Sequence, residues 1–318
     1  MATSTEVPPS AKKKKRRAKK PAVDQNSLIG HSKFLPYALS FPSIFMISAL
    51  LAFPVVYAAI GSLYGTDFIG GPQYWVGLDN YVLLFQDPQF LSSIWRTFIF
   101  VGGTLVIGTA LGLMFAFALN RAAGKLRFLR GLTIVPYLVS GVATAVVFRL
   151  ILNKDFGAVN RIIEFLGFEP IGFFSDPKMA MLASILAQVW ADLPLAVLLM
   201  LGGLQTIEPS LLDAAAVDGA NGWSRAWRIS IPLIGPQIAL STILLSYQAL
   251  TSLGVIIALT GGGPVNATRT LPIALYETAF LDLRTNEALA IVIVILVLNA
   301  LLTLGYIGAS RRYDMGEQ

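Results

Sequence analysis

The residues that could do chemistry in this sequence are few, and most of them interrupt long apolar segments. Cysteine is absent and His31 is the only histidine, which leaves almost no room for thiolate or histidine metal sites or for Ser-His-Asp catalysis. Polar side chains within apolar segments tend to face protein or water rather than lipid. The candidates for contact with a polar solute are therefore Gln188, Trp190, Asp192, Ser246, Tyr247, Gln248 and Asn299.

Two interpretations of this polar set remain open. Carboxamides and a carboxylate can bind the hydroxyl groups of a sugar, and an aromatic face can pack against its ring. The same side chains can instead join one helix to another, a contact worth about 0.6 kcal/mol on average in one membrane protein. Arg149 offers a similar choice, between an anionic solute and the membrane interface that its long side chain can reach.

The amino-acid composition indicates what kind of protein must position these polar residues. Of the 318 residues, 55 % are hydrophobic and only 13 % are charged, and the mean hydropathy is +0.67. Soluble domains average about 45–50 % apolar and about 25 % charged residues. So little charge cannot cover a surface that faces water. Lipid therefore surrounds most of this chain, and an ordinary soluble enzyme is excluded.

Six apolar segments follow the N-terminal region. Each has at least about 20 residues, enough to cross a hydrocarbon core of about 30 Å. The sequence therefore predicts an all-α fold, a polytopic membrane protein with six transmembrane helices in the cell membrane. The segments lie at about residues 37–62, 94–119, 131–153, 179–204, 234–259 and 287–309.

Lys and Arg are distributed unevenly around these segments. Seventeen of the 24 lie in the two terminal regions and in the two loops on the same side of the membrane as the termini. The other seven lie in the opposite loops or near them. Because cytoplasmic segments carry an excess of Lys and Arg, both termini are predicted to be cytoplasmic.

Residues 1–32 are predicted to form a disordered basic tail. Between Lys12 and Lys20 this region has eight basic residues in nine positions, which cannot pack into a core. A cytoplasmic tail attracted to anionic lipid is favoured over a patch that binds nucleic acid. The transmembrane domain is assigned to residues 33–312, and residues 313–318 form a C-terminal tail.

The loop between the fourth and fifth segments, about residues 205–232, carries the strongest local signals. Pro209 suits the first turn of a helix, and Gly219 suits the left-handed position that ends one. Asn221 can cap a second short helix, whose shared face would carry Trp223, Ala226, Trp227 and Ser230. The loop is therefore predicted to be a helical hairpin, suited either to docking a partner or to lying on the membrane as a connector.

This loop resembles the EAA loop of ABC-importer membrane subunits, whose pattern is EAA-x3-G-x9-I-x-LP. Two residues depart from the pattern: Asp213 replaces the leading Glu, and its carboxylate reaches one methylene less far, while Ile231 replaces the Leu before the proline. The resemblance implies that the loop couples the chain to an ATPase. The residues at matching positions are Asp213, Ala214, Ala215, Gly219, Ile229 and Pro232.

The resemblance extends over about residues 35–310 and implies a type-1 ABC transmembrane domain. Residues 76–81 look like the GLxNY segment of carbohydrate-importer permeases, and residues 260–264 and 276–280 look like their TGGP and YxxAF elements. Together these segments favour the maltose, lactose and glycerol-3-phosphate type of importer.

Membership of that family would make the chain half of the translocation path for a sugar or oligosaccharide. The implied partners are a second, homologous permease, two ATP-binding subunits, an extracytoplasmic solute-binding protein and membrane lipid, with no nucleic acid. ATP and Mg would bind to the ATPase subunits, so no catalytic residue, metal or cofactor is expected on this chain. The alternatives are a permease for glycerol 3-phosphate or another small polar solute, and an ion-coupled secondary transporter.

Single cysteines placed in this cysteine-free chain test the predicted orientation. An impermeant maleimide added to intact cells should label a cysteine at Asn266, in the third outer loop, because that loop is predicted to face outward. Cysteines at Ser10 and Gly316 should stay unlabelled until the membrane is permeabilised. Strong labelling of either terminus in intact cells would reverse the assignment.

Overall fold

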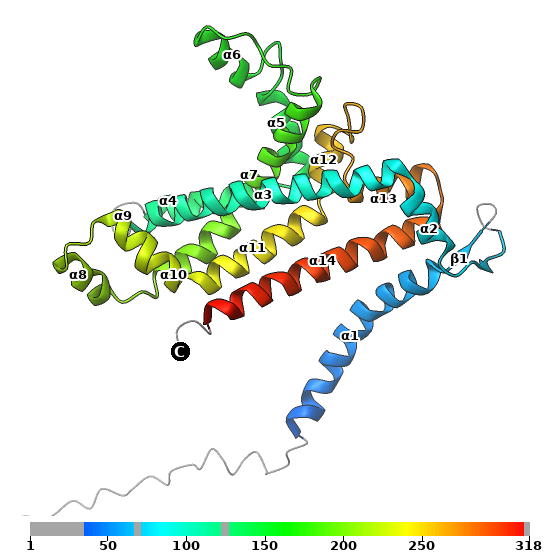
Figure 1. Cartoon of the computed structure of the whole chain (residues 1–318), viewed down its shortest axis with the longest axis horizontal. Coiled ribbons are helices and arrows are strands. Elements are labelled where there is room, and N and C mark those ends of the chain that lie inside the picture. The colour runs from blue at the N-terminus through cyan, green and yellow to red at the C-terminus, as the bar shows by residue number, and fades with distance from the viewer. Residues whose placement is uncertain (1–34, 67–70, 122–126, 315–318) are drawn as a thin grey trace, which may run out of the picture. The chain divides into compact units, whose positions relative to one another are not determined.

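A computed structural model of the chain describes residues 35–66, 71–121 and 127–314. The regular structure in these ranges is almost entirely helical (Figure 1), which confirms the all-α prediction. The chain divides into two compact units, residues 1–53 and 54–318. The predicted basic tail lies outside the described residues, as do residues 315–318.

Helix α1 (Leu35–Gly61) begins in the first unit and ends in the second. The second unit continues with β1 (Tyr64–Gly65) and β2 (Tyr74–Trp75), an antiparallel pair in which Tyr64 lies opposite Trp75. Then come α2 (Asp79–Gln86), α3 (Pro88–Arg121), α4 (Arg127–Ile134), the 3-10 turn η1 (Val135–Leu138), α5 (Gly141–Ile151), α6 (Ala158–Phe165) and α7 (Pro177–Leu204). After α7 the chain forms α8 (Pro209–Val217), α9 (Gly222–Arg225), the π-helical turn η2 (Ala226–Ser230), α10 (Ile231–Leu233), α11 (Gly235–Leu250), α12 (Gly254–Leu259), α13 (Leu271–Tyr276), the π-helical turn η3 (Glu277–Leu281) and α14 (Thr285–Asp314).

Four of the described helices are long and apolar enough to cross a membrane, namely α1, α3, α7 and α14. Two bent pairs also qualify if each pair counts as one span: residues 131–138 with α5, and residues 222–233 with α11. At 1.5 Å per residue, the 34 residues of α3 extend about 51 Å, well beyond a hydrocarbon core of about 30 Å. The described residues therefore contain four to six candidate spans.

The segment expected at residues 131–153 is not one continuous helix. Val139 and Ser140 are extended, with ψ angles of 132° and 150°. The Ser140 hydroxyl accepts a hydrogen bond from the Ala143 N–H at 3.2 Å and so caps α5, which is bent 99° from the preceding helix. A capping side chain starts a new helix in a new direction, a change that hydropathy does not record.

The segment expected at residues 234–259 is also interrupted, between Leu250 and Gly254. The Thr251 hydroxyl donates to the Tyr247 carbonyl at 2.8 Å, within its own helix. The Ser252 hydroxyl instead donates to Gln188 Oε1 on α7 at 2.5 Å. The break in α11 is therefore also the point at which its polar side chains reach another helix.

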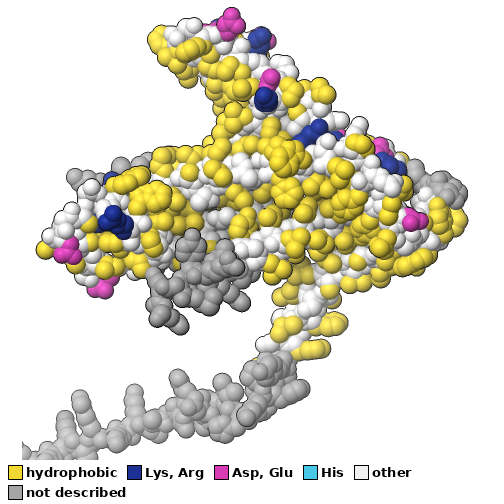
Figure 2. Space-filling model, viewed as in Figure 1, with side chains coloured by type: hydrophobic (Ala, Val, Ile, Leu, Met, Phe, Trp, Pro, Cys, Tyr) yellow, Lys and Arg dark blue, Asp and Glu magenta, His cyan; other side chains and the backbone are white. Residues whose placement is uncertain are grey.

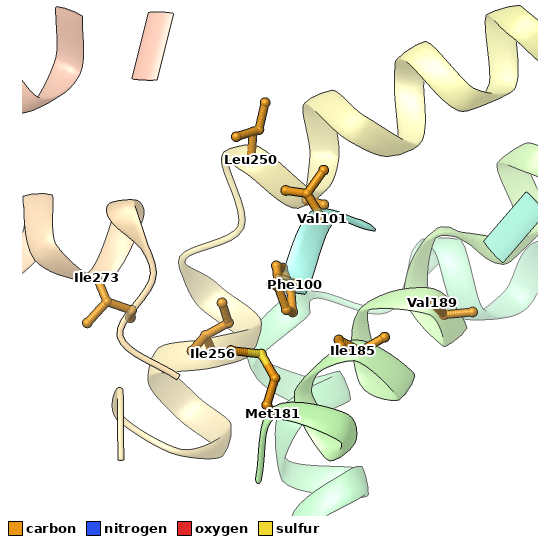
Figure 3. Close-up of a cluster of buried hydrophobic side chains, with 9 residues drawn as sticks. Phe100, Val101, Met181, Ile185, Val189, Leu250, Ile256 and Ile273 are labelled. Carbon is orange, nitrogen blue, oxygen red and sulfur yellow. The ribbon is translucent and has the colours of Figure 1, made fainter. Parts of the chain in front are cut away.

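A buried hydrophobic cluster joins helices that are distant in the sequence (Figure 3). Helices α3 and α7 also approach closely at Gly112, where a Cβ atom would lie 3.2 Å from the Ala196 Cβ. In lipid, small residues permit such close packing, and the packing replaces the hydrophobic effect as the source of stability. The cluster contains Phe100 and Val101 from α3, Met181, Ile185 and Val189 from α7, Ala249 and Leu250 from α11, Ile256 from α12 and Ile273 from α13.

The surface of the second unit is also largely apolar. Hydrophobic side chains cover most of the face in Figure 2, and charged side chains gather toward the ends of the helices and on the α5–α6 segment. The buried core is therefore small relative to the apolar surface that lipid or partner chains must cover.

Helix α13 is tied to α3 by side-chain hydrogen bonds. The Leu271 N–H donates to Thr97 Oγ1 at 2.8 Å, and Arg269 Nη1 donates to Ser93 Oγ at 2.9 Å. Arg269 also forms an ion pair with Glu277. These contacts hold the loop between α12 and α13 against the start of α3.

Replacing Thr97 by Val tests this tie. The change leaves the buried Leu271 N–H without its acceptor, so we expect the free energy of unfolding to fall by about 1–3 kcal/mol. The melting temperature of the purified protein in detergent, followed by circular dichroism, should fall accordingly.

The matched control is Thr104→Val on the same helix. The Thr104 hydroxyl is buried and has no hydrogen-bond partner among the described residues. Its replacement by a methyl group should leave the melting temperature unchanged or raise it. Equal losses in the two variants would contradict the proposed tie.

Candidate functional site

Residues 209–230 form the helical hairpin that the loop sequence predicts. Pro209 occupies the first turn of α8, where its missing N–H costs nothing. No residue of α8 is buried, and the helix lies at one end of the second unit (Figure 1). The hairpin therefore presents a short helix that the rest of the described chain does not cover.

Gly219 ends α8 in the left-handed conformation, with φ +84°. The Ala220 N–H donates to the Ala215 carbonyl at 2.9 Å, and the Gly219 N–H donates to the Ala216 carbonyl at 3.1 Å. This pair of bonds is the Schellman arrangement that closes a helix C-terminus. Nothing lies within 4 Å of the position that a Cβ atom would take, so the backbone angle alone favours glycine here.

Asn221 caps the second helix as expected, because its Oδ1 accepts from the Ser224 N–H at 2.8 Å. Arg225 Nη1 then donates to the Leu212 carbonyl at 3.4 Å and joins the two helices. The expected four-residue face is incomplete: the rings of Trp223 and Trp227 lie 5.5 Å apart, tilted 54° to each other, and are exposed, whereas Ser230 is buried. The π-helical turn η2 explains the difference, because its wider turn shifts the register of the residues that follow.

The six residues with EAA-type spacing are spread along the hairpin and just beyond it: Asp213, Ala214 and Ala215 lie in α8, Gly219 lies at the turn, Ile229 lies in η2, and Pro232 lies in α10. Within the described residues, no Lys or Arg lies within ion-pair distance of Asp213. Its carboxylate is therefore available to a group on another chain. Asp213, Ala214, Gly219 and Pro232 are exposed, and Ala215 and Ile229 are half-buried.

A second candidate site lies inside the bundle, where Gln188 and Asp192 of α7 are only 5 % and 4 % exposed. Gln188 Nε2 donates to Asp192 Oδ2 at 2.7 Å, while Gln188 Oε1 accepts from the Ser252 hydroxyl. The Gln248 carboxamide lies beside the Asp192 carboxylate. These four side chains therefore form one polar network that joins α7, α11 and the break after α11.

The network lines a cavity of about 490 Å³. Both helix breaks reach this cavity: Val139 and Gly141 line it from the first break, and residues 251–255 line it from the second. Among the residues whose side chains the structure describes, no Lys or Arg contributes to its lining. The cavity offers a carboxylate, two carboxamides and hydroxyl groups, which suit a solute rich in hydroxyls.

The other polar candidates lie elsewhere. Tyr247 and Asn299 line a separate, mostly apolar cavity of about 600 Å³ between α11 and α14. The Trp190 ring packs edge-on against Phe148, with ring centroids 6.0 Å apart. Ser246 donates to the Ile243 carbonyl of its own helix. The structure thus brings together Gln188, Asp192 and Gln248 and separates them from the rest of the set.

Ser252 and Tyr137, which also line the polar cavity, were not among the candidates taken from the sequence. Ser252 follows an apolar run, and only the break after Leu250 turns its hydroxyl into a partner for Gln188. The X-Pro-aromatic sequence at residues 135–137 was the available signal for Tyr137, since it marks a turn. Arg149 is exposed and does not line the cavity.

Two of the segments used to recognise the importer type have structural roles. Asn80 is buried and donates to the carbonyls of Ser62 and Tyr64 at 2.7 and 2.9 Å. Glu277 pairs with Arg269. These residues hold loops in place rather than lining the polar cavity.

Comparison with known proteins places this geometry in a family. Residues 108–313 match the family described as binding-protein-dependent transport system inner membrane component. The match covers more than half of the chain, so the chain belongs to this family. It is a permease subunit of an ABC importer, a transport component rather than an enzyme, and the ion-coupled secondary transporter is set aside.

Curated relatives agree with this assignment. The chain is 33 % identical over 270 residues to the sn-glycerol-3-phosphate transport system permease protein UgpA of Shigella flexneri, covering 84 % of this chain and 91 % of the relative. It is 30 % identical over 263 residues to the sulfoquinovosyl glycerol transport system permease protein SmoG of Agrobacterium fabrum strain C58, covering 82 % and 85 %.

A solved structure shares the fold. A chain of a bacterial alginate ABC transporter, in complex with an alginate pentasaccharide-bound periplasmic protein, aligns with a TM-score of 0.74 at 24 % identity. The alignment covers 88 % of this chain and 94 % of that one. At this identity, the likeness shows that the two chains share a fold.

Proposed function

We propose that this permease forms half of the path by which an ATP-driven importer moves a neutral sugar or oligosaccharide into the cell. The implied partners are a second, homologous permease, two cytoplasmic ATP-binding subunits and an extracytoplasmic solute-binding protein. Residues 131–138 with α5 are taken as one span and α11 with α12 as another, which with the four long helices makes six spans with both termini in the cytoplasm. The excess of Lys and Arg on the side of the termini supports this orientation.

The polar cavity at the two helix breaks is the observation that carries the substrate assignment. Gln188, Asp192 and Gln248 supply acceptors and donors from α7 and α11, and the hydroxyls of residues 251 and 252 add to them. Polar groups inside spans face protein or a water-filled path. A polyhydroxylated solute can exchange hydrogen bonds with each of these groups in turn.

The charge of the cavity favours a neutral solute. Asp192 contributes a carboxylate, and no cationic side chain in the described part of the chain lines the same space. An anion entering this half of the path would meet like charge without a compensating partner. The relatives named for glycerol-3-phosphate, and the solved transporter for the acidic polysaccharide alginate, define the alternative, an anionic solute.

Competition for uptake by the assembled importer separates the two substrate classes. Neutral di- or oligosaccharides should inhibit uptake of the natural solute, and glycerol 3-phosphate should not. Inhibition by glycerol 3-phosphate alone would show that the solute is anionic. It would not affect the assignment of the chain as an importer permease.

Asp192→Asn tests whether the cavity is the path. The variant keeps the size of the side chain but removes the charge-assisted hydrogen bonds, which contribute about 1.5–3 kcal/mol each. We expect the uptake rate at low solute concentration to fall by about tenfold or more, with normal amounts of inserted protein.

Asn299→Leu is the control, because Asn299 lines the other cavity. Because a helix–helix hydrogen bond is worth only about 0.6 kcal/mol, a change at Asn299 that affects packing alone should alter uptake by no more than about threefold. Equal defects in the two variants would show that Asp192 acts only in helix packing.

The second part of the proposal gives the hairpin the task of coupling. An uncovered α8 with an unpaired Asp213 is suited to insert into a groove on an ATPase subunit. The Gly219 turn and the Asn221 cap fix how α8 meets α9. Movement of the ATPase would then pass through α9 and α10 to α11, whose far end lines the polar cavity.

Gly219→Val tests the coupling role. An L-residue in the left-handed conformation costs roughly 1–2 kcal/mol, so the end of α8 should distort while the spans remain intact. We expect near-normal insertion and a sharp fall in solute-stimulated ATP hydrolysis by the reconstituted complex.

Gly219→Asn is the matched control, since Asn tolerates the left-handed conformation and the added side chain has open space. This variant should retain most of the activity. Parental transport and hydrolysis in Gly219→Val would show that the loop is a connector and would end the coupling proposal.

A further inference from the structure

A long apolar groove lies on the outside of the second unit, away from the polar cavity. It has a volume of about 890 Å³ and runs between α3 on one side and α9, η2 and α10 on the other. Its polar lining is sparse: among the side chains that form it, Thr109 and Thr242 carry hydroxyls and Arg121 carries a charge. The groove is therefore unsuited to a sugar.

The floor of the groove is hollow because two alanines lie along one face of α3. Ala110 and Ala118 are exposed and line the groove. The larger Leu113, Met114 and Phe117 lie between them along the helix and also line it. From Leu105 to Arg121 the groove follows 16 steps of the helix, about 24 Å. This length exceeds one leaflet of a hydrocarbon core of about 30 Å, so the groove can hold an extended acyl chain.

One end of the groove has the types of residue that are common at a membrane–water interface. Trp223 and Trp227 line this end and are 73 % and 53 % exposed, and tryptophan is enriched at the level of lipid headgroups. Arg121 lies at the same end, with its Nη2 3.1 Å from the position that a Cβ atom on Gly222 would take. No carboxylate of the described residues lies within ion-pair distance of Arg121.

We propose that this groove is a binding site for an anionic phospholipid of the cytoplasmic leaflet. The acyl chain would lie along α3 over Ala110 and Ala118, and the phosphate would pair with Arg121 beside the two tryptophans. The orientation rests on the proposed function, which places the end of α3 in the cytoplasm. Basic pockets between helices on that side of a membrane bind acidic headgroups.

Charge complementarity favours a lipid over a helix of another subunit. A helix filling the groove would have to bring a carboxylate to Arg121 at the membrane surface, whereas every anionic phospholipid brings a phosphate to that level. The lipid would contact α3 and the hairpin side together. It would therefore hold the hairpin in place relative to the bundle and make coupling dependent on lipid composition.

Photoactivatable phosphatidylglycerol, incorporated with the purified importer complex in nanodiscs, tests the proposal directly. Peptides from residues 109–118 and 223–231 should be labelled by this probe at least several times more than by photoactivatable phosphatidylcholine. Labelling needs neither ATP nor solute. A negative labelling result would therefore not affect the import and coupling experiments. Negative results in those experiments would likewise not affect the labelling test.

Four variants locate the recognition. Arg121→Gln should lower phosphatidylglycerol labelling about fivefold, the effect of one cation near an anionic surface, and Arg121→Lys should restore most of it. Arg228→Gln is the matched control, because it removes the same charge from an exposed position on η2, a turn that borders the groove, and Arg228 itself does not line the groove. Ala110→Trp should fill the groove and abolish labelling by both lipids.

Three results would overturn the proposal. Equal labelling by the two lipids would show that the groove does not select charge. Equal losses in Arg121→Gln and Arg228→Gln would show only a diffuse attraction to the loop. Cross-links from the groove of the assembled complex to a helix of the second permease, in place of lipid, would identify that helix as the occupant.

Discussion

Interrupting a helix inside an apolar bundle leaves backbone donors and acceptors that lipid cannot pair, and this constraint organises the structure. Such breaks persist only where protein groups or a water-filled cavity satisfy the freed positions. Here two breaks, near Ser140 and Thr251, open toward the same face of α7. Gln188, Asp192 and Ser252 provide the polar surroundings there. The breaks need polar groups around them, and this need gathers hydrogen-bond donors and acceptors in one cavity.

The two candidate sites differ in how the chain supports them. The cavity is lined by the buried side chains of Gln188, Asp192 and Ser252, and their network joins segments 64 residues apart in the sequence. The hairpin depends on bonds between near neighbours, such as those of Gly219 and Asn221. A permease needs both kinds of support. The path must keep its shape while solute passes, and the contact with a motor must be able to adjust to its partner.

The turn and caps of the hairpin could be predicted from the sequence, whereas the grouping of the cavity residues could not. The helix that begins at Pro209, the turn at Gly219 and the cap at Asn221 were predictable, because each depends on the conformational preference of one residue. The helical class and the candidate spans followed from hydropathy. Pro136 marks a kink within residues 131–153, but hydropathy does not record direction, so neither the 99° bend after Leu138 nor the break after Leu250 was predicted. The separation of Asn299 from Gln188 depends on which helices become neighbours, which no local pattern specifies.

Helix α8 has nine residues, and none of them is buried. Isolated helices shorter than about 12–15 residues are marginal in water, so α8 depends on the Gly219 turn at its C-terminus and on the bond from Arg225. Loss of either contact would lower the fraction of α8 that is helical before a partner binds it. The apparent dissociation constant of a helix-binding partner equals the intrinsic constant divided by the folded fraction. Any change that weakens the ends of α8 consequently weakens its docking by the same factor, without altering one atom of the contact surface.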